Sequence, residues 1–149
     1  MSEVSTGRIG ELIAALRLTQ MGIENTISPL NGSDIIATTK GKLYRVQVKA
    51  RSMPDSSRPS HFMWTTSYSS KKKVPYTCYS SKKKVPYTRK HCDIMALVSI
   101  PHENVYFMPV INETSVTRRL KVEIFDDKSI ASSTWEKAIS DLDNSDRTS

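Results

Sequence analysis

An alternating segment, Leu43 to Arg51, limits most strongly what this chain can fold into. Its apolar positions are Tyr44, Val46, Val48 and Ala50, and each is followed by a polar residue. Successive side chains of a β-strand point to opposite faces of the sheet. One face of this strand is therefore expected to enter a core, and the other to carry Arg45, Gln47, Lys49 and Arg51.

A second segment, Asp34 to Thr38, precedes this strand and predicts a β-hairpin with it. The two are joined by a four-residue loop that contains one glycine. If Thr38 pairs with Leu43 across the loop, the antiparallel ladder places Asp34 opposite Gln47. Asp34, Gln47 and Lys49 then converge, whereas a slip of one residue would turn Asp34 to the other face.

A helix with few polar positions is predicted near the start of the chain, from Thr6 to Met21. Its apolar residues recur at i, i+3, i+4 and i+7, at Ile9, Leu12, Ile13 and Leu16. Ala14, Ala15 and Leu18 make the opposite side apolar as well, so the helix is expected to be buried on most sides. Glu11 is then a carboxylate in apolar surroundings, which costs several kcal/mol unless it is paired or bound to a metal. Arg8 and Lys49 are its alternative structural partners.

The rest of the chain predicts one α/β domain over residues 1–142, with a central mixed sheet flanked by two helices. Further strands are predicted at 23–29, 61–68, 92–100, 104–110 and 119–125. Ser133 and Glu136 have the spacing of a capping box, which predicts a closing helix that carries Trp135. Residues 143–149 are expected to be a disordered tail.

Positive charge is concentrated in the middle of the chain, in a predicted basic insertion at about 52–91. Residues 40–90 hold fourteen Lys or Arg and a single acid, Asp55, whereas the whole chain carries a net charge of +7. A polyanion such as nucleic acid is the expected partner, although a lysine run is also typical of a solvated surface. The candidate DNA contacts are Arg51, Arg58, Lys71, Lys72, Lys73, Lys82, Lys83, Lys84, Arg89 and Lys90.

An internal repeat lies within this basic insertion. The ten residues YSSKKKVPYT occur at 68–77 and again at 79–88. Two copies of this length are too few for a repeat architecture, so the repeat is interpreted as a local duplication inside a loop. Tyr76 and Tyr87 are interpreted as anchors of that loop in preference to bases for stacking.

The remaining chemistry-bearing residues give weaker signals. Cys78 and Cys92 form no CxxC pair and are interpreted as reduced thiols, while His61, His91 and His102 lack the spacing of metal ligands. Asp93 either supports an active site or begins a strand after a turn. The chain has no apolar run of the ~18 residues that a membrane span requires, and an intracellular, cytoplasmic and nucleoid-associated location is expected.

The order of these features resembles the PD-(D/E)XK nuclease superfamily, and within it the small homing endonucleases encoded in bacterial group I introns. The matching segments cover most of residues 6–110: TGRIGELIAA from Thr6, GSDIIATTKGKLYRVQVKA from Gly32, YSSKKKVPYT, and CDIMALVSIPHENVYFMPV from Cys92. Ser33 replaces the proline of the superfamily name. Gln47 stands where most members have an acid, a form that the intron-encoded group shares. A single copy of YSSKKKVPYT is expected in that group.

The resemblance implies an active site and a cofactor. Glu11, Asp34, Gln47 and Lys49 are the implied catalytic residues, and Mg²⁺ or Mn²⁺ is the implied cofactor. Asp34 and the amide carbonyl of Gln47 are expected to bind the ion, with the backbone carbonyl of Val48 as a further ligand. Glu11 is expected to bind a second ion or a water beside the metal, and Lys49 to orient the attacking water or steady the reacting phosphate.

The implied function is site-specific double-strand cleavage of DNA. A double-strand cut requires two active sites, so a homo-oligomer is expected, a dimer at least and a tetramer by resemblance. A Holliday junction resolvase or restriction-type nuclease on the same fold is an alternative. A basic nucleic-acid-binding protein without catalysis is another.

Overall fold

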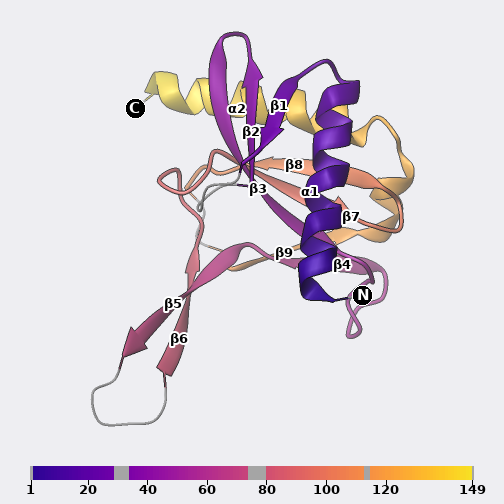
Figure 1. Cartoon of the computed structure of the whole chain (residues 1–149), viewed down its shortest axis with the longest axis vertical. Helices are drawn as coiled ribbons and strands as arrows, with labels where there is room; N and C mark the ends of the chain where they lie inside the picture. The colour runs from indigo at the N-terminus through magenta and orange to yellow at the C-terminus, as the bar shows by residue number, and fades with distance from the viewer. Residues whose placement is uncertain (1, 29–33, 74–79, 113–114, 149) are drawn as a thin grey trace.

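The fold is built on a five-stranded mixed sheet, in the order β1-β2-β3-β7-β8 (Figure 1). The computed structural model describes residues 2–28, 34–73, 80–112 and 115–148. The strands of this sheet are β1 (Glu24–Ile27), β2 (Ile35–Thr39), β3 (Lys42–Arg51), β7 (Ile94–Ser99) and β8 (Asn104–Pro109). Only β3 and β7 pair in parallel, and the other neighbours are antiparallel. The expected mixed sheet of an α/β fold is confirmed.

The register of the β2–β3 hairpin agrees with the sequence prediction. Thr38 pairs with Leu43, and the ladder continues to the Asp34 backbone, whose N–H donates to Val46 O at 3.1 Å. The loop is shorter than expected, because Thr39 and Lys42 also pair. The two remaining residues, Lys40 and Gly41, have φ angles of 52° and 76°, which suit the tight turns that match the twist of a hairpin. Losing one loop residue on each side leaves the register unchanged.

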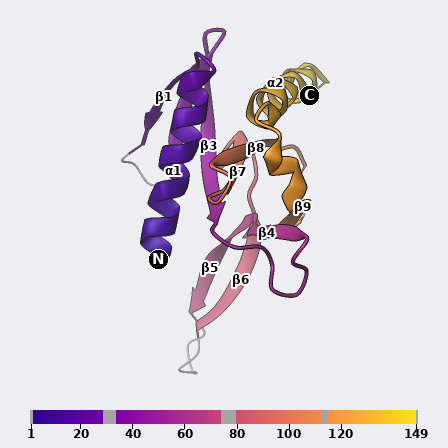
Figure 2. The ribbon, with the colours of Figure 1, turned by 90° about the vertical axis from the view of Figure 1, so that its right-hand side faces the viewer.

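The two faces of the sheet are covered by different elements. Alternation along β7 sends Ala96 and Val98 to one face and Met95 and Leu97 to the other. The first face packs against both long helices, α1 (Glu3–Gln20) and α2 (Ile130–Thr148). The second face packs against β4 (His61–Thr65) and the short helix η1 (Val122–Asp126), and β4 in turn pairs with β9 (Thr117–Lys121). Figure 2 shows α1 and α2 beside the sheet and β4 with β9 beneath it.

Helix α2 extends further at both ends than the sequence suggested. It begins at Ile130, so Ser133 is not its cap, and the Ser133 hydroxyl instead donates to Ile130 O at 3.3 Å. The prediction that residues from Asp143 are disordered is wrong up to Thr148, which is helical. Asp143 accepts an ion pair from Lys42 at 3.3 Å and Asp146 one from Arg89 at 3.2 Å. These distant partners hold the last turns of α2.

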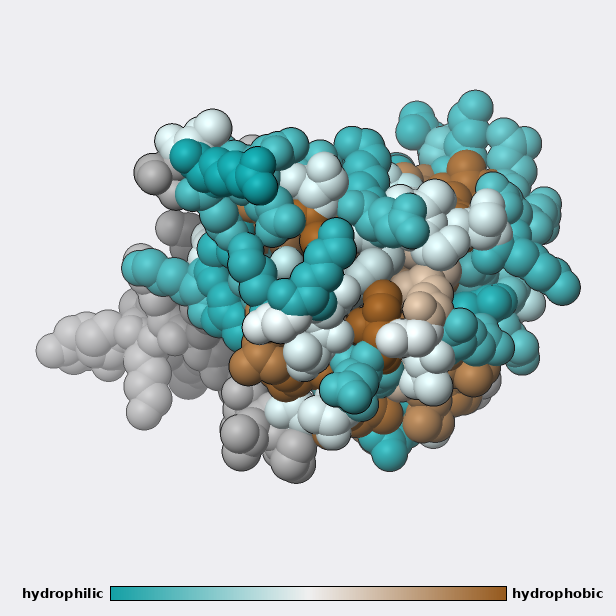
Figure 3. All heavy atoms as spheres, turned by 90° about the horizontal axis from the view of Figure 1, so that it is seen from above, coloured by the Kyte–Doolittle hydropathy of each residue, from teal (hydrophilic) through white to brown (hydrophobic). Residues whose placement is uncertain are grey.

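Helix α1 is less buried than the sequence predicted. Leu12 and Leu16 are 49% and 50% exposed, whereas Ala14 and Leu18 are fully buried. The expectation that the helix is buried on most sides is therefore wrong, and α1 lies against the sheet with one side open to solvent. Hydrophobic areas also interrupt the largely hydrophilic surface that is seen from above (Figure 3).

A close contact between α1 and β3 occurs at Gly10, one residue before Glu11. A Cβ atom at this position would lie 2.5 Å from Ala50 Cβ, well inside van der Waals contact, and 3.4 Å from Val48 Cγ1. The helix can therefore approach β3 this closely only because the residue has no side chain. The same contact fixes where Glu11 stands relative to β3.

We expect Gly10→Ala to lower the free energy of unfolding by up to about 2 kcal/mol. Overpacking costs about 1–3 kcal/mol, which outweighs the gain of about 1 kcal/mol from alanine in a helix. Gly7→Ala is the matched control, since a Cβ at Gly7 meets nothing within 4 Å. That variant should gain stability. Urea unfolding of both variants measures the difference, and equal stabilisation of the two would contradict the close approach.

A second hairpin extends away from the body of the molecule (Figure 1). It consists of β5 (Ser67–Lys73) and β6 (Ser80–Pro86), so the two copies of the repeat form paired strands, and their interpretation as a loop is wrong for these residues. The register pairs Lys71 with Lys82, Ser70 with Lys83 and Lys72 with Ser81. Both lysine triplets thus lie on one hairpin. Tyr76 and Cys78 lie outside the described residues, as do Gly32 and Ser33.

Candidate active site

Asp34 stands directly before β2, facing the middle of β3. Its Oδ2 accepts hydrogen bonds from Gln47 Nε2 at 2.8 Å and from the Val48 backbone N–H at 2.9 Å. Burial raises the pKa of the Asp34 carboxyl, while the Val48 N–H and the nearby positive charge of Lys49 act in the opposite direction. The structure thus brings Asp34 and Gln47 together as the hairpin register predicted, and the Val48 N–H is a further donor to the carboxylate.

The donor set at Asp34 fits a hard divalent cation. Because the Gln47 amide turns its NH₂ group toward the carboxylate, its carbonyl oxygen is directed away from Asp34 Oδ2. Among the described residues there is no group of three or more His, Cys, Asp or Glu that could hold a metal by themselves. Mg²⁺ does not require such a cage, since it keeps several waters and binds through one or two carboxylates together with substrate phosphates. The Asp34 carboxylate suits that ion, and the groups that meet its Oδ2 in this structure are the Gln47 NH₂ and the Val48 N–H.

Lys49 lies on the same face of β3 as Gln47, two residues further along. Burial lowers the pKa of its ammonium group, and the negative charge of Asp34 opposes that shift. Its Nζ lies 5.2 Å from the centroid of the Tyr87 ring. Lys49 is therefore a partly desolvated cation beside an aromatic ring, and the charge of Asp34 acts on it. It can donate hydrogen bonds to a phosphate or a water and cannot accept any while charged.

Glu11 pairs with a neighbour on its own helix. Its Oε2 forms an ion pair with Arg8 Nη1 at 3.3 Å, and its side chain is 23% exposed. Of the two structural partners considered, Arg8 and Lys49, the structure thus shows Arg8. The Gly10 contact with Ala50 nevertheless brings α1 against the part of β3 that carries Val48 and Lys49.

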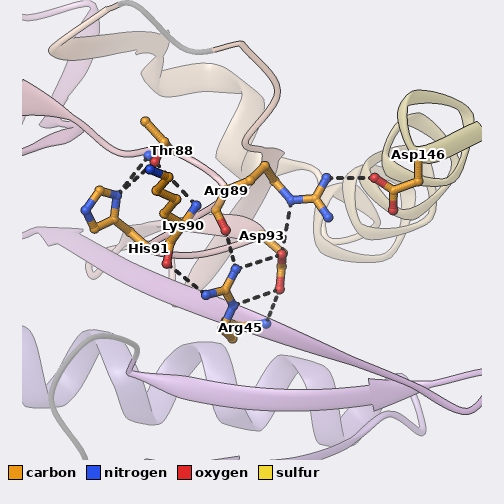
Figure 4. Close-up of polar contacts among 7 residues, drawn as sticks. All are labelled: Arg45, Thr88, Arg89, Lys90, His91, Asp93 and Asp146. Atoms are coloured by element: carbon orange, nitrogen blue, oxygen red, sulfur yellow. Dashed lines mark hydrogen bonds and ion pairs between the residues drawn. The ribbon is translucent and has the colours of Figure 1, made fainter. Parts of the chain in front are cut away.

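A network of charged side chains forms beside the site, around Arg45 on β3 (Figure 4). Asp93 accepts hydrogen bonds from the Arg45 backbone N–H at 2.8 Å and from the Arg45 side chain at 3.3 Å. The Arg45 guanidinium also donates to the backbone carbonyls of Arg89 and Lys90. Arg89 in turn binds Asp93 at 3.1 Å and Asp146 at 3.2 Å. The segment between β6 and β7 is thereby fastened to β3.

Asp93 links Arg45 and Arg89 in this network. Burial disfavours its charged form, but the hydrogen bonds and charge of Arg45, together with the charge of Arg89, lower the pKa of Asp93. The turn interpretation of Asp93 missed this arrangement. Alternation predicted Arg45 on the polar face of β3, and no local pattern indicated its partners more than 40 positions away.

The predicted DNA contacts lie at two kinds of place. Arg51 ends β3, Arg58 lies in the connection before β4, and both are exposed. The lysine triplets lie in β5 and β6. Arg89 is already bound to two carboxylates, so a phosphate contact through its guanidinium would compete with those ion pairs.

Cys92, His91 and His102 are each held by burial or by a polar contact. Cys92 is buried, and burial raises the pKa of its thiol to about 12, so the thiol stays protonated at neutral pH. His91 Nδ1 lies 3.1 Å from the Thr88 hydroxyl, and His102 Nδ1 lies 2.6 Å from Ser99 Oγ.

Neither α1 nor α2 is both long enough and apolar enough to cross a lipid bilayer.

Comparisons with known proteins place this geometry in a family. A search of curated proteins gave no match. Among solved structures, the chain is similar to a bacterial homing endonuclease, I-Ssp6803I, with a TM-score of 0.65 and 18% sequence identity, covering 80% of this chain and 78% of that one. At this identity the likeness shows a shared fold. The family described as PD-(D/E)XK endonuclease matches residues 1–138, nearly the whole sequence. The chain therefore belongs to the PD-(D/E)XK endonuclease family, the hydrolytic nucleases of DNA.

Proposed function

We propose that this chain is a site-specific, double-strand DNA endonuclease of the homing type that requires a divalent metal ion, Mg²⁺ or Mn²⁺. One observation carries the proposal: Gln47 and Val48 both donate hydrogen bonds to Asp34 at the start of the β2–β3 hairpin, and the positive charge of Lys49 acts on the same carboxyl group. A carboxylate that can hold a metal ion, with an ammonium group nearby, can serve the hydrolysis of a phosphodiester. The fold shared with a homing endonuclease supports the choice within the family.

Each residue has a distinct task in this proposal. Asp34, Gln47 and the Val48 carbonyl would hold the metal ion, which when bound supplies charge relief at the scissile phosphate and lowers the pKa of water. The hydrogen bonds from Gln47 and Val48 fix the Asp34 carboxylate before any substrate arrives. Lys49 orients the attacking water or a phosphate oxygen. Glu11 would act from α1 after exchanging its Arg8 partner for a second ion or a water.

The DNA is proposed to lie along the basic insertion. The β5–β6 hairpin carries both lysine triplets away from the body, and Arg51 and Arg58 are exposed at the end of β3 and in the connection to β4. Contacts between these residues and phosphates would make affinity fall steeply with salt. Because each chain carries one such site and a double-strand cut needs two, the active form is proposed to be a homo-oligomer, a dimer at least and a tetramer by analogy.

The test is cleavage of duplex DNA that carries candidate intron-insertion sites, with Mg²⁺ and with EDTA. We expect defined double-strand products with Mg²⁺ and none with EDTA, because the carboxylate and carbonyl ligands cannot replace the charge of the ion. Gel mobility shifts in Ca²⁺ measure binding separately from cutting.

Two other outcomes would change the assignment. A four-way DNA junction in the same assay tests the resolvase alternative, and cleavage of the junction alone would contradict the homing function. Binding that is equal with and without metal, with no cleavage of any substrate, would favour the non-catalytic binding protein.

A further inference from the structure

Tyr87 lies where the basic hairpin returns to the body of the molecule, directly after β6. Its side chain is 8% exposed and packs in the cluster that also contains Cys92 and Leu97. The centroid of its ring lies 5.2 Å from Lys49 Nζ. An ammonium group at this distance is attracted by the negative face of an aromatic ring, and the attraction strengthens when the pair is shielded from water. The ring thus lies beside the ammonium group of the candidate active site.

The ring itself is held on several sides. The Tyr87 backbone N–H donates to Thr66 O at 3.3 Å, and the ring meets the His91 ring edge-on, with centroids 6.0 Å apart and planes at 88°. His91 Nδ1 in turn lies 3.3 Å from the Thr88 backbone N and 3.1 Å from its hydroxyl. The position of the ring is therefore set by the backbone and by a neighbouring ring.

The segment that follows Tyr87 is tied to the same strand that carries Lys49. Arg45, two residues before Gln47 on β3, donates to the carbonyls of Arg89 and Lys90 and binds Asp93 (Figure 4). Arg45, Gln47 and Lys49 share one face of β3 by alternation. The positions of the lysine and the ring therefore both depend on β3. Lys49 is a residue of that strand, and the segment that follows Tyr87 is bound to it by the Arg45 network.

We propose that Tyr87 is a positioning residue for Lys49, whose ring face holds the ammonium group where it can act on the scissile phosphate. This rests on the proposed function, because Lys49 needs a fixed place only if it takes part in hydrolysis. Since Tyr87 directly follows β6, the placement of Lys49 also depends on the base of the hairpin proposed to contact DNA. A small misplacement of a catalytic group lowers the rate strongly.

A purely structural role for Tyr87 predicts something different, and two substitutions separate the roles. Tyr87→Phe keeps the ring and removes the hydroxyl, whereas Tyr87→Leu keeps an apolar side chain and removes the ring. A core-filling residue would tolerate both changes in catalysis as long as the protein stays folded. A positioning ring would be rescued only by phenylalanine.

The first measurement is the single-turnover cleavage rate at saturating DNA, with the DNA affinity and melting temperature of each variant. We expect Tyr87→Phe to cleave within about twofold of the original rate and Tyr87→Leu to lose about tenfold, with affinity unchanged in both. Equal rates in the two variants, or an equal loss in both, would overturn the proposal.

The second measurement does not depend on cleavage. Trace acylation with acetic anhydride, followed by mass spectrometry, reports how accessible and free the Lys49 amine is, with the exposed Lys128 as internal reference. We expect the labelling of Lys49 to rise about threefold or more in Tyr87→Leu and to stay unchanged in Tyr87→Phe. Unchanged labelling in Tyr87→Leu would overturn the contact. If the original protein cleaves no DNA but the labelling pattern is as expected, the ring holds Lys49 and only the proposed function fails.

Discussion

Asp34→Asn is expected to abolish DNA cleavage and to leave DNA binding in place. Asparagine has the shape of aspartate, and its amide oxygen can still accept the hydrogen bond from the Val48 N–H that Asp34 Oδ2 accepts at 2.9 Å. It lacks the charge that holds a divalent ion. Because metal ions contribute several kcal/mol of charge stabilisation in phosphoryl chemistry, we expect the single-turnover rate to fall by about 10³-fold or more.

A carboxylate elsewhere provides the control for this variant. Asp141 lies on α2 and pairs with Lys137 at 3.2 Å, so Asp141→Asn removes one negative charge outside the site and should cleave normally. Affinity for DNA, measured in Ca²⁺ at fixed salt, should stay within about threefold in both variants, since phosphate contacts dominate it. Loss of binding in Asp34→Asn, with the fold intact, would assign Asp34 to DNA contact or structure and would contradict a metal site.

Lys49→Met has the second largest expected effect. Methionine preserves the length and most of the apolar stem of lysine, but it cannot donate a hydrogen bond to a water or a phosphate oxygen. Removing one such donor typically lowers a rate by about 10²–10³-fold. The single-turnover rate at saturating DNA measures this loss.

The binding data decide whether Lys49 is catalytic or only a DNA contact. Lys128→Met removes an exposed lysine outside the site and should cleave as the original protein does. If Lys49→Met recovers full cleavage at high DNA concentration, Lys49 contributes binding alone and its assigned role is wrong. A rate that stays low with all DNA bound supports the role in hydrolysis.

The parts of the fold that the sequence predicted correctly depend on local pairing. The β2–β3 register follows from alternation and a short loop, and a loop shortened by one residue on each side gives the same ladder. The convergence of Asp34, Gln47 and Lys49 was predictable because all three belong to this one hairpin. Glu11 was found from its helix, yet its ion pair with Arg8 shows that its place in the site depends on more than sequence order.

The incorrect predictions concern choices that distant contacts decide. Helix α1 is apolar around most of its circumference, so periodicity alone could not say which side meets the sheet, and the contact of Gly10 with Ala50 decides it. The end of α2 has a polar sequence, and its order comes from Lys42 and Arg89, which lie far away in the chain. The contact between Tyr87 and Lys49 joins two segments that no local pattern relates.

The β5–β6 ladder has a symmetry that follows from its repeated sequence. Lys71 pairs with Lys82, the residue that occupies the same place in the second copy. On one side of this pair Ser70 pairs with the duplicate of Lys72, and on the other side Lys72 pairs with the duplicate of Ser70. An antiparallel ladder between a segment and its copy is therefore related to itself by a local twofold axis through that lysine pair. Any segment able to form such a self-complementary ladder acquires its partner strand by one tandem duplication, so a single genetic event suffices to supply both arms of the hairpin.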